Sequence, residues 1–189
     1  MDGIDDQYDP HAVEETVGRH WAEEDAYAVA KAAHRGDPPW VFVDGPPYTS
    51  GQMHLGTAWN KTLKDAVLRY KRMSGFDVRD RPGYDMHGLP IEVKVEAALG
   101  FDSKRDIETF GIEAFIEECR RFAIENREAM DIDFQSIGVW MDWDDPYQTL
   151  TPEYMEAAWW VFKQVSERGL LDRGKRSVAY CPRCQTAIA

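Results

Sequence analysis

Residues 45–61, GPPYTSGQMHLGTAWNK, form a loop rich in glycine and proline between an apolar run and a predicted helix. His54 and Thr57 would lie on the first turn of that helix, with Asn60 one turn further on. Unpaired backbone N–H groups and the positive end of the helix dipole favour an anion such as phosphate at this position. An imidazole and a hydroxyl group there would donate hydrogen bonds to phosphate oxygens as their charge shifts. A tight turn with a surface histidine is the competing interpretation of an isolated His-x-Gly.

Cys181 and Cys184 have the Cys-x-x-Cys spacing of one half of a zinc knuckle. A closed tetrahedral site needs two more ligands, which this pair does not supply. The third cysteine, Cys119, falls in a predicted helix and is interpreted as part of the core. Three cysteines, two of them close together, suit a reducing compartment and indicate a metal more than a disulfide.

Two further clusters allow both a chemical and a structural interpretation. Four tryptophans, which could serve as stacking platforms for bases, are expected instead to pack in the core and at domain joints. They are Trp140, Trp143, Trp159 and Trp160. Three neighbouring aspartates would suit a magnesium ion, but a solvated acidic turn is the favoured interpretation. They are Asp142, Asp144 and Asp145.

The order of the predicted elements indicates an α/β domain with a mainly parallel sheet and flanking helices. Helices are predicted at residues 9–33, 54–74, 91–99, 112–130 and 152–169, and strands at 40–45, 76–79 and just before Cys181. The periodicity places five apolar side chains on one face of the second helix: Leu55, Trp59, Leu63, Val67 and Tyr70. Thr151 is predicted to cap the last helix, with Pro152 as its first residue. Ligands of such sheets bind at the carboxyl ends of the strands, where both glycine- and proline-rich loops fall.

The composition is that of a folded globular protein, because 43% of the 189 residues are hydrophobic and 12% are aromatic. This length suits one domain with a core and at most a small appendage. No apolar run is long enough to cross a membrane, and the N-terminal residues MDGIDDQYDP are too acidic for a signal peptide. A cytoplasmic protein without a membrane partner is therefore predicted.

The net charge of −12, taken alone, argues against a nucleic-acid partner, because phosphate binding needs lysine and arginine. The acidic residues are spread along the chain rather than gathered in a tail, and aspartate outnumbers glutamate. Such a diffuse acidic surface is expected of a halophile protein, since high salt screens most long-range repulsion. An ordinary acidic cytosolic protein is the alternative.

The motifs taken together resemble those of class I aminoacyl-tRNA synthetases. PPYTSGQMHLGTAWNKTLKD is similar to the His-x-Gly-His type signature of that family, which follows a strand and a proline-rich turn. Residues 83–96, GYDMHGLPIEVKVE, resemble the element of the isoleucine-specific members, most like the archaeal type, and differ from the valine-specific Gly-Thr-Asp-His-Ala-Gly pattern. IGVWMDWDDPYQT and GLLDRGKRSVAYCPRCQTAIA also look like that family, in the expected order. The resemblance covers nearly the whole chain from Trp40 onward.

The resemblance implies an ATP site at the first motif. His54, Gly56 and Thr57 would line the ATP phosphates and take part in catalysis, with Asn60 nearby and Mg²⁺ accompanying the nucleotide. The family signature often ends in a second histidine, and Thr57 stands at that position. A hydroxyl group still donates to phosphate but carries no positive charge, and activity is expected to survive this replacement.

The resemblance also implies an amino-acid site. Pro46 would form part of the wall against the isoleucine side chain, and Asp85 would hold the α-ammonium group, since a fixed carboxylate pairs well with a cation. A capping or loop carboxylate is the alternative for Asp85, and His87 and Glu92 are expected to support the site structurally. The ligands that would complete a zinc site with the cysteine pair are expected beyond residue 189.

The whole pattern implies the N-terminal part of a ligase that activates isoleucine with ATP and passes it to isoleucine tRNA, and that is a monomer when complete. The implied domains are an N-terminal helical extension at 1–36, the first part of a Rossmann-like catalytic domain at 37–178, and the start of a zinc knuckle leading to an inserted editing domain at 179–189. The chain alone is then expected to be inactive and to expose apolar surface. The alternatives are a valine or leucine ligase of the same class and a non-catalytic nucleotide-binding fragment.

Overall fold

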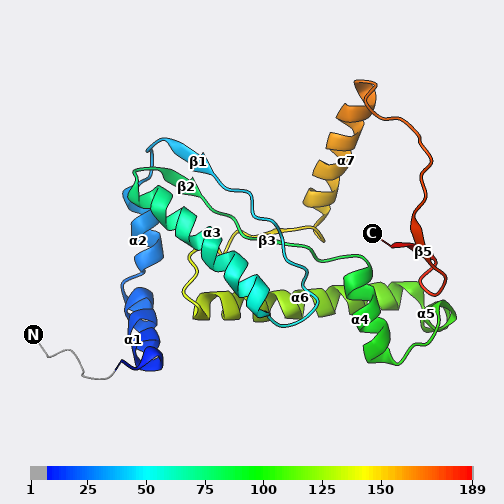
Figure 1. The fold of residues 1–189 in the computed structure, drawn as a ribbon, viewed down its shortest axis with the longest axis horizontal. Coiled ribbons are helices and arrows are strands. Elements are labelled where there is room, and N and C mark those ends of the chain that lie inside the picture. Colours follow the sequence, from blue (N-terminus) through cyan, green and yellow to red (C-terminus); the bar gives the residue numbers. More distant parts are fainter. Residues whose placement is uncertain (1–7, 189) are drawn as a thin grey trace, which may run out of the picture. The chain divides into compact units, whose positions relative to one another are not determined.

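The computed structural model describes residues 8–188, which form two units (Figure 1). The first unit contains residues 8–44, 53–82 and 131–145, and the second contains residues 45–52, 83–130 and 146–188. Each unit is therefore built from segments that are distant in the sequence. Among the described residues, no helix combines the length and the apolar character that crossing a membrane requires.

Two helices open the first unit where the periodicity predicts one. They are α1 (Pro10–Glu23), capped by the side chain of Asp9, and α2 (Ala26–Ala33). The chain breaks between them because Asp25 adopts the left-handed conformation, with φ 46° and ψ 47°. The prediction of a single helix at residues 9–33 is wrong, since apolar spacing does not report such a backbone reversal.

A strand–helix–strand sequence forms the centre of the first unit, as predicted. It consists of β1 (Pro39–Val41), α3 (Leu55–Met73) and β2 (Asp77–Arg79). The two strands pair in parallel, with Trp40 opposite Val78. A parallel pair connected through a helix is the repeating unit of α/β folds, so the predicted fold class is confirmed at this point.

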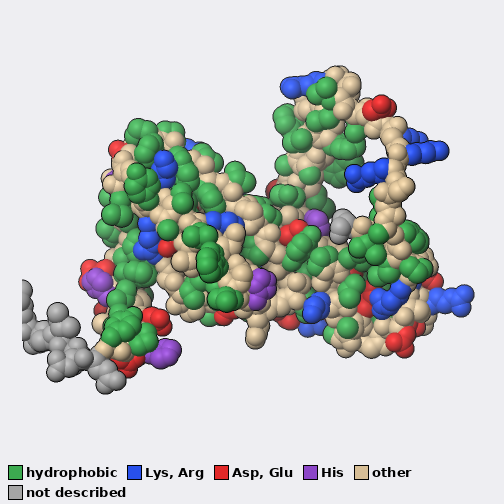
Figure 2. All heavy atoms as spheres, viewed as in Figure 1, with side chains coloured by type: hydrophobic (Ala, Val, Ile, Leu, Met, Phe, Trp, Pro, Cys, Tyr) green, Lys and Arg blue, Asp and Glu red, His purple; other side chains and the backbone are tan. Residues whose placement is uncertain are grey.

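The buried face of α3 is mostly charged, whereas its apolar face is exposed. The helix buries four residues at helical spacing: Lys61, Asp65, Leu68 and Arg72. The five apolar residues that the periodicity places together are exposed by between 47% and 81%: Leu55, Trp59, Leu63, Val67 and Tyr70. Figure 2 shows hydrophobic side chains gathered over β1 and α3. The expectation of exposed apolar surface is therefore met on this helix.

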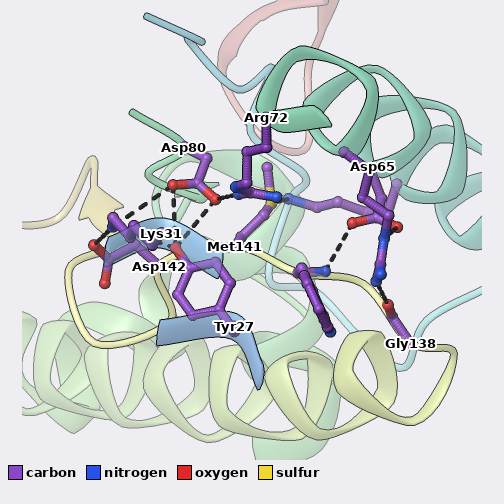
Figure 3. A network of polar contacts seen from close by, with 11 residues as sticks. Tyr27, Lys31, Asp65, Arg72, Asp80, Gly138, Met141 and Asp142 are labelled. Carbon is purple, nitrogen blue, oxygen red and sulfur yellow. Dashed lines mark hydrogen bonds and ion pairs between the residues drawn. The ribbon is translucent and has the colours of Figure 1, made fainter. Parts of the chain in front are cut away.

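Asp80, directly after β2, organises a buried polar network (Figure 3). Arg72 of α3 donates to its carboxylate, and the Lys31 ammonium of α2 lies 3.7 Å from it and also pairs with Asp142. The Tyr27 hydroxyl lies 3.1 Å from both carboxylate oxygens. Burial, with the nearby carboxylates, raises the pKa of Tyr27, and burial also raises that of Asp80 against the effect of the cations. Charged side chains thus connect α2, α3 and β2.

The second unit combines short strand pairs with four helical segments. β3 (Gly83–Tyr84) pairs in parallel with β4 (Tyr147–Gln148), and β5 (Ala179–Cys181) pairs antiparallel with β6 (Thr186–Ile188). The helices are α4 (Leu89–Leu99), α5 (Lys104–Phe110), α7 (Pro152–Glu167) and residues 112–130 of α6 (Ile112–Ser136). Thr151 caps α7 with Pro152 in its first turn, as predicted. No local pattern in the sequence predicts α5, β3 or β4.

Gly83 allows the two parallel strands β3 and β4 to approach closely. A Cβ atom at this position would lie 2.1 Å from the Tyr147 ring, so only glycine fits. The apolar core of this unit consists mainly of Tyr84, Met86, Ile91, Val95, Phe115 and Ala123, all buried. This packing fixes the end of β3, where the second motif of the sequence lies.

Candidate functional site

His54 is the N-cap of α3, with an extended backbone at φ −108° and ψ 165°. Its Nδ1 accepts a hydrogen bond from the Thr57 backbone N–H at 3.2 Å, so the imidazole folds over the first helical turn. Because Nδ1 is the acceptor, the neutral ring carries its proton on Nε2, which lies 3.1 Å from the Thr57 hydroxyl. The predicted helix start near His54 is confirmed, and the same ring that would face a ligand also caps the helix.

Gly56 provides the space that the His54 ring occupies. A Cβ atom at position 56 would lie 3.2 Å from both Cε1 and Nδ1 of His54, closer than an ordinary contact. The His-x-Gly spacing therefore has a steric reason in this fold. His54, Gly56 and Asn60 are all exposed. An exposed helix start with an imidazole N–H beside it has the donors that an anion requires.

A buried ion pair fixes α3 next to this turn. Lys61 pairs with Asp44, and their side chains are 1% and 0% exposed. Lys64 lies 2.6 Å from the other oxygen of the same carboxylate, and the Lys61 ammonium lies 4.9 Å from the centre of the Phe134 ring. Burial lowers the pKa of Lys61, although Asp44 opposes this effect. The pair attaches the end of the run WVFVD to the helix that carries His54.

Asp85 lies alongside the proline-rich segment in the second unit. Its backbone N–H donates to the Pro47 carbonyl at 2.9 Å, and its carbonyl accepts from the Thr49 N–H at 3.0 Å. This parallel bridge places the residues directly after Pro46 against Asp85, the residue that follows β3. The structure thus brings together the segments that carry Pro46 and Asp85.

The Asp85 carboxylate is oriented by Thr149, which the sequence analysis does not identify. The Thr149 hydroxyl donates to Oδ1 of Asp85 at 3.5 Å and accepts the Met86 N–H at 2.9 Å. Nδ1 of His87 lies 3.7 Å from the same oxygen, and the Asp85 carboxylate raises the pKa of Tyr48. Thr149 is 64 residues from Asp85, and only the pairing of β3 with β4 brings it there. No local sequence signal could have found it.

Cys181 ends β5, and Cys184 lies on the turn that leads to β6. The Cys184 N–H donates to Cys181 Sγ at 3.5 Å, and this bond lowers the pKa of the Cys181 thiol. Arg183 attaches the turn to α4, with its guanidinium 2.9 Å from the buried Glu96 carboxylate and 3.4 Å from the Phe101 carbonyl. Within residues 8–188 no group of three or more His, Cys, Asp and Glu residues could hold a metal. The pair fits half of a tetrahedral zinc site.

The tryptophans divide between packed and exposed positions. The Trp140 ring lies 5.0 Å from that of Trp21, and the Trp143 ring lies 6.0 Å from that of Phe134, as core packing requires. Trp159 and Trp160 are 71% and 62% exposed on α7, a helix that buries none of its residues. These two therefore do not pack in the core of the described residues, and their expected place at a domain joint stays a prediction.

The aspartates after α6 lie on a turn where Asp144 and Asp145 are exposed, as predicted, and two of the three also form ion pairs. Asp142 pairs with Lys31, and Asp145 lies 2.9 Å from the Arg81 guanidinium. Asp144 is exposed. Lys31 and Arg81 come from distant segments, so these ion pairs could not be predicted from the residues around the aspartates.

The comparisons with known proteins define the class. Residues 16–189 match the family model described as tRNA synthetases class I (I, L, M and V), and the chain belongs to this family. It is 72% identical over its whole length to an isoleucine–tRNA ligase of Haloquadratum walsbyi, covering 18% of that protein. It is 63% identical over 98% of its length to the ligase of the same name from Halobacterium salinarum, covering 17% of it. The chain thus spans less than a fifth of the length of these relatives.

A solved structure supports the fold alone. The agnB2 LeuRS of Agrobacterium radiobacter K84, determined in a ternary complex with tRNA and LeuAMS, matches 96% of this chain with a TM-score of 0.66 and 22% identity. The match covers 21% of that protein. The predicted Rossmann-like architecture of a class I synthetase is therefore confirmed.

Proposed function

We propose that this chain acts as part of an isoleucine–tRNA ligase, in which isoleucine and ATP form isoleucyl-adenylate and the isoleucyl group passes to its tRNA. The carrying observation is the 72% identity to the Haloquadratum walsbyi isoleucine–tRNA ligase across the whole chain. The carboxylate of isoleucine attacks the α-phosphate of ATP, the bond to the β-phosphate breaks, and pyrophosphate leaves. Positioning and charge stabilisation supply most of the rate in such a reaction.

His54, Gly56, Thr57 and Asn60 are the proposed ATP residues, the first three also catalytic. Two observations support this role: the His54 ring folds over the first turn of α3 with Nδ1 accepting the Thr57 N–H, and Gly56 leaves room for the ring there. The N-terminal N–H groups of α3 would add their dipoles to the same phosphates. Mg²⁺ would accompany ATP as part of the substrate.

Asp85 is the proposed partner of the α-ammonium group of isoleucine, with Pro46 beside the side chain. The support is that the Asp85 carboxylate accepts from Thr149 and remains 21% exposed, so it is oriented yet open to a cation. A charge-assisted hydrogen bond between this carboxylate and an ammonium group would select amino acids over other carboxylic acids.

Zinc at Cys181 and Cys184 is proposed as a structural ion, with further ligands outside the described residues. When bound, zinc would crosslink this turn, and Arg183 would hold the turn on α4 through Glu96. No chemical step depends on it. Residues 1–36, 37–178 and 179–189 are proposed as the helical extension, the catalytic segment and the start of the knuckle before an editing domain.

A cytoplasmic, salt-adapted monomer is proposed for the protein of the relatives' length. Net charge −12 supports the salt adaptation, and two of the relatives named above come from Haloquadratum and Halobacterium. Acidic surfaces remain folded where high salt screens their repulsion.

The test uses a chimaera in which this chain replaces the matching segment of the Haloquadratum walsbyi ligase. Isoleucine-dependent exchange of pyrophosphate into ATP is expected, well above the rates with valine or leucine. Asp85→Ala should raise KM for isoleucine on the order of ten- to a hundredfold, since one hydrogen bond to a charged group is lost, with little change in KM for ATP. Asp144→Ala, at an exposed aspartate, is the control.

Preference for valine or leucine would contradict the assignment to isoleucine and favour a neighbouring ligase. Nucleotide binding without amino-acid-dependent exchange would indicate a non-catalytic binding module. An unchanged KM for isoleucine in Asp85→Ala would remove Asp85 from the amino-acid site.

A further inference from the structure

Residues 168–176, RGLLDRGKR, reverse the charge balance of the chain. They contain four cations and one acid, a net charge of +3, in a protein whose net charge is −12. Arg168 stands at the C-terminal end of α7, where a cation complements the helix dipole, so it has a structural explanation. The other three cations, Arg173, Lys175 and Arg176, form the basic segment.

The basic segment lies in the extended stretch between α7 and β5, and all three of its side chains are exposed. Figure 2 shows the blue side chains of this stretch standing out beside α7. Among the described residues, none of the three cations forms an ion pair with a carboxylate. Other arginines of the same unit differ: Arg183 pairs with Glu96, and Arg121 pairs with Glu118 and Glu125.

Concentrating cations without partners on an exposed connecting segment costs mutual repulsion and contributes no packing. An acidic chain offers many carboxylates that could have compensated them, as they do for Arg121. A polyanion is the ligand that this charge pattern fits, because each contact releases counterions from it. Two of the three cations are arginines, whose planar forks match phosphate oxygens bidentately.

The flanking residues favour a nucleic-acid backbone over an acidic protein surface. Gly169 and Gly174 leave the main chain free to follow a curved row of phosphates. The three members of the basic segment are all cations, which supply charge rather than an aromatic anchor, while Leu170, Leu171 and Val178 beside it are exposed apolar residues. Contacts of this kind position a nucleic acid without reading its sequence.

We propose that Arg173, Lys175 and Arg176 bind the phosphate backbone of the tRNA. This inference rests on the proposed function for the identity of the RNA. It adds a contact surface outside the motifs that the ATP and amino-acid sites use. The net charge of −12 argues against a nucleic-acid partner. The basic segment answers this objection, because it supplies the lysine and arginine side chains that phosphate contacts need.

The test compares two triple variants of the chimaera. Arg173→Gln/Lys175→Gln/Arg176→Gln removes the basic segment, and Lys94→Gln/Lys104→Gln/Arg105→Gln removes three exposed cations elsewhere in the same unit. Circular dichroism identifies potassium chloride concentrations at which all proteins are folded. Pyrophosphate exchange, which needs no tRNA, should equal that of the parent in both variants. In aminoacylation, loss of the basic segment should raise KM for tRNA on the order of tenfold, and the control should not.

The salt dependence of tRNA binding provides the second measurement. The slope of log affinity against log salt should become shallower by about 2 to 3 when three phosphate contacts of about 0.7 to 0.9 each are removed. Equal slopes and equal KM values in the two variants would overturn the proposal. Displacement of tRNA by polyglutamate as readily as by unrelated RNA would overturn it in favour of an acidic protein partner. Loss of exchange in the parent itself would instead reject the proposed function.

Discussion

At the residue scale, the first motif is a helix cap as well as a candidate phosphate site. Nδ1 of His54 accepts the Thr57 N–H at 3.2 Å, and Gly56 leaves space for the ring. Capping fixes the tautomer, so the proton needed for donation to a phosphate resides on Nε2. Both ring nitrogens lie close to Thr57, Nδ1 at its backbone N–H and Nε2 3.1 Å from its hydroxyl group, so the cap and the candidate phosphate donor share one residue.

The substitution Gly56→Ala tests whether the position of the His54 ring matters for the reaction as well as for the helix cap. Alanine favours a helix by about 1 kcal/mol over glycine, while a displaced N-cap costs about 1 kcal/mol, so the free energy of unfolding should change little. The added Cβ would press on the His54 ring, and pyrophosphate exchange in the chimaera should fall by about a hundredfold, as for loss of one transition-state donor.

Gly18→Ala in α1 is the matched control, because a Cβ atom there has no neighbour within 4 Å. It should stabilise the protein slightly and leave exchange intact. Full exchange activity in Gly56→Ala would show that the position of the His54 ring is not needed for the reaction.

At the element scale, α5 depends on a charged cap. The Asp106 carboxylate accepts the backbone N–H groups of Ser103 at 2.7 Å and Asp102 at 2.9 Å, which lowers its pKa. A lowered carboxyl pKa contributes stability above the unfolded value of about 3.9 and loses it as the pH falls through the folded pKa. The helix is therefore expected to weaken only in acid.

Asp106→Asn should lower the free energy of unfolding at neutral pH, and the difference from the parent should disappear as the pH falls below about 4. Denaturant titrations across this pH range measure it, with Asp102→Asn as the control for a neighbouring carboxylate. A difference that persists unchanged in acid would mean that ionisation of Asp106 does not support the cap.

Ion pairs of Asp80 and Asp145 differ in burial, and substitutions of these two aspartates are expected to differ in their effect on stability. Asp80→Ala should lower the free energy of unfolding by about 3 to 5 kcal/mol, because Arg72 and Lys31 are left as buried or half-buried cations without this carboxylate. Asp145→Ala breaks an exposed pair with Arg81, and its cost should be about 0 to 1 kcal/mol. Similar losses in the two variants would show that burial does not determine the importance of these pairs.

At the scale of the whole molecule, net charge −12 predicts that stability depends on salt. The free energy of unfolding should rise with potassium chloride concentration, since the screening length falls to about 3 Å at 1 M salt and repulsion between surface carboxylates is reduced. Thermal unfolding monitored by circular dichroism at increasing salt measures it. Stability that does not increase toward molar salt would contradict salt adaptation and favour an ordinary acidic protein.

Four features could be predicted from the amino-acid order alone: the strand–helix–strand order, the start of α3 near His54, the Thr151 cap and the family. These features depend on short-range patterns: glycine and proline loops, cap residues and apolar runs, whose physical causes lie within a few neighbours. The same reasoning failed at Asp25, where one left-handed residue divides a helix, and missed the short elements α5, β3 and β4.

Contacts between segments distant in the sequence determine which side chains meet. The tertiary structure buried the charged face of α3 and exposed the apolar one, because Asp44 and Asp80 reach Lys61 and Arg72 from other segments. It brought Thr149 to Asp85 across 64 residues through the pairing of β3 with β4. Periodicity identifies the faces of an element, whereas partners distant in the sequence determine which face is covered. The chemistry of single motifs could therefore be predicted from the sequence. The orientation of the Asp85 carboxylate could be determined only from the folded structure.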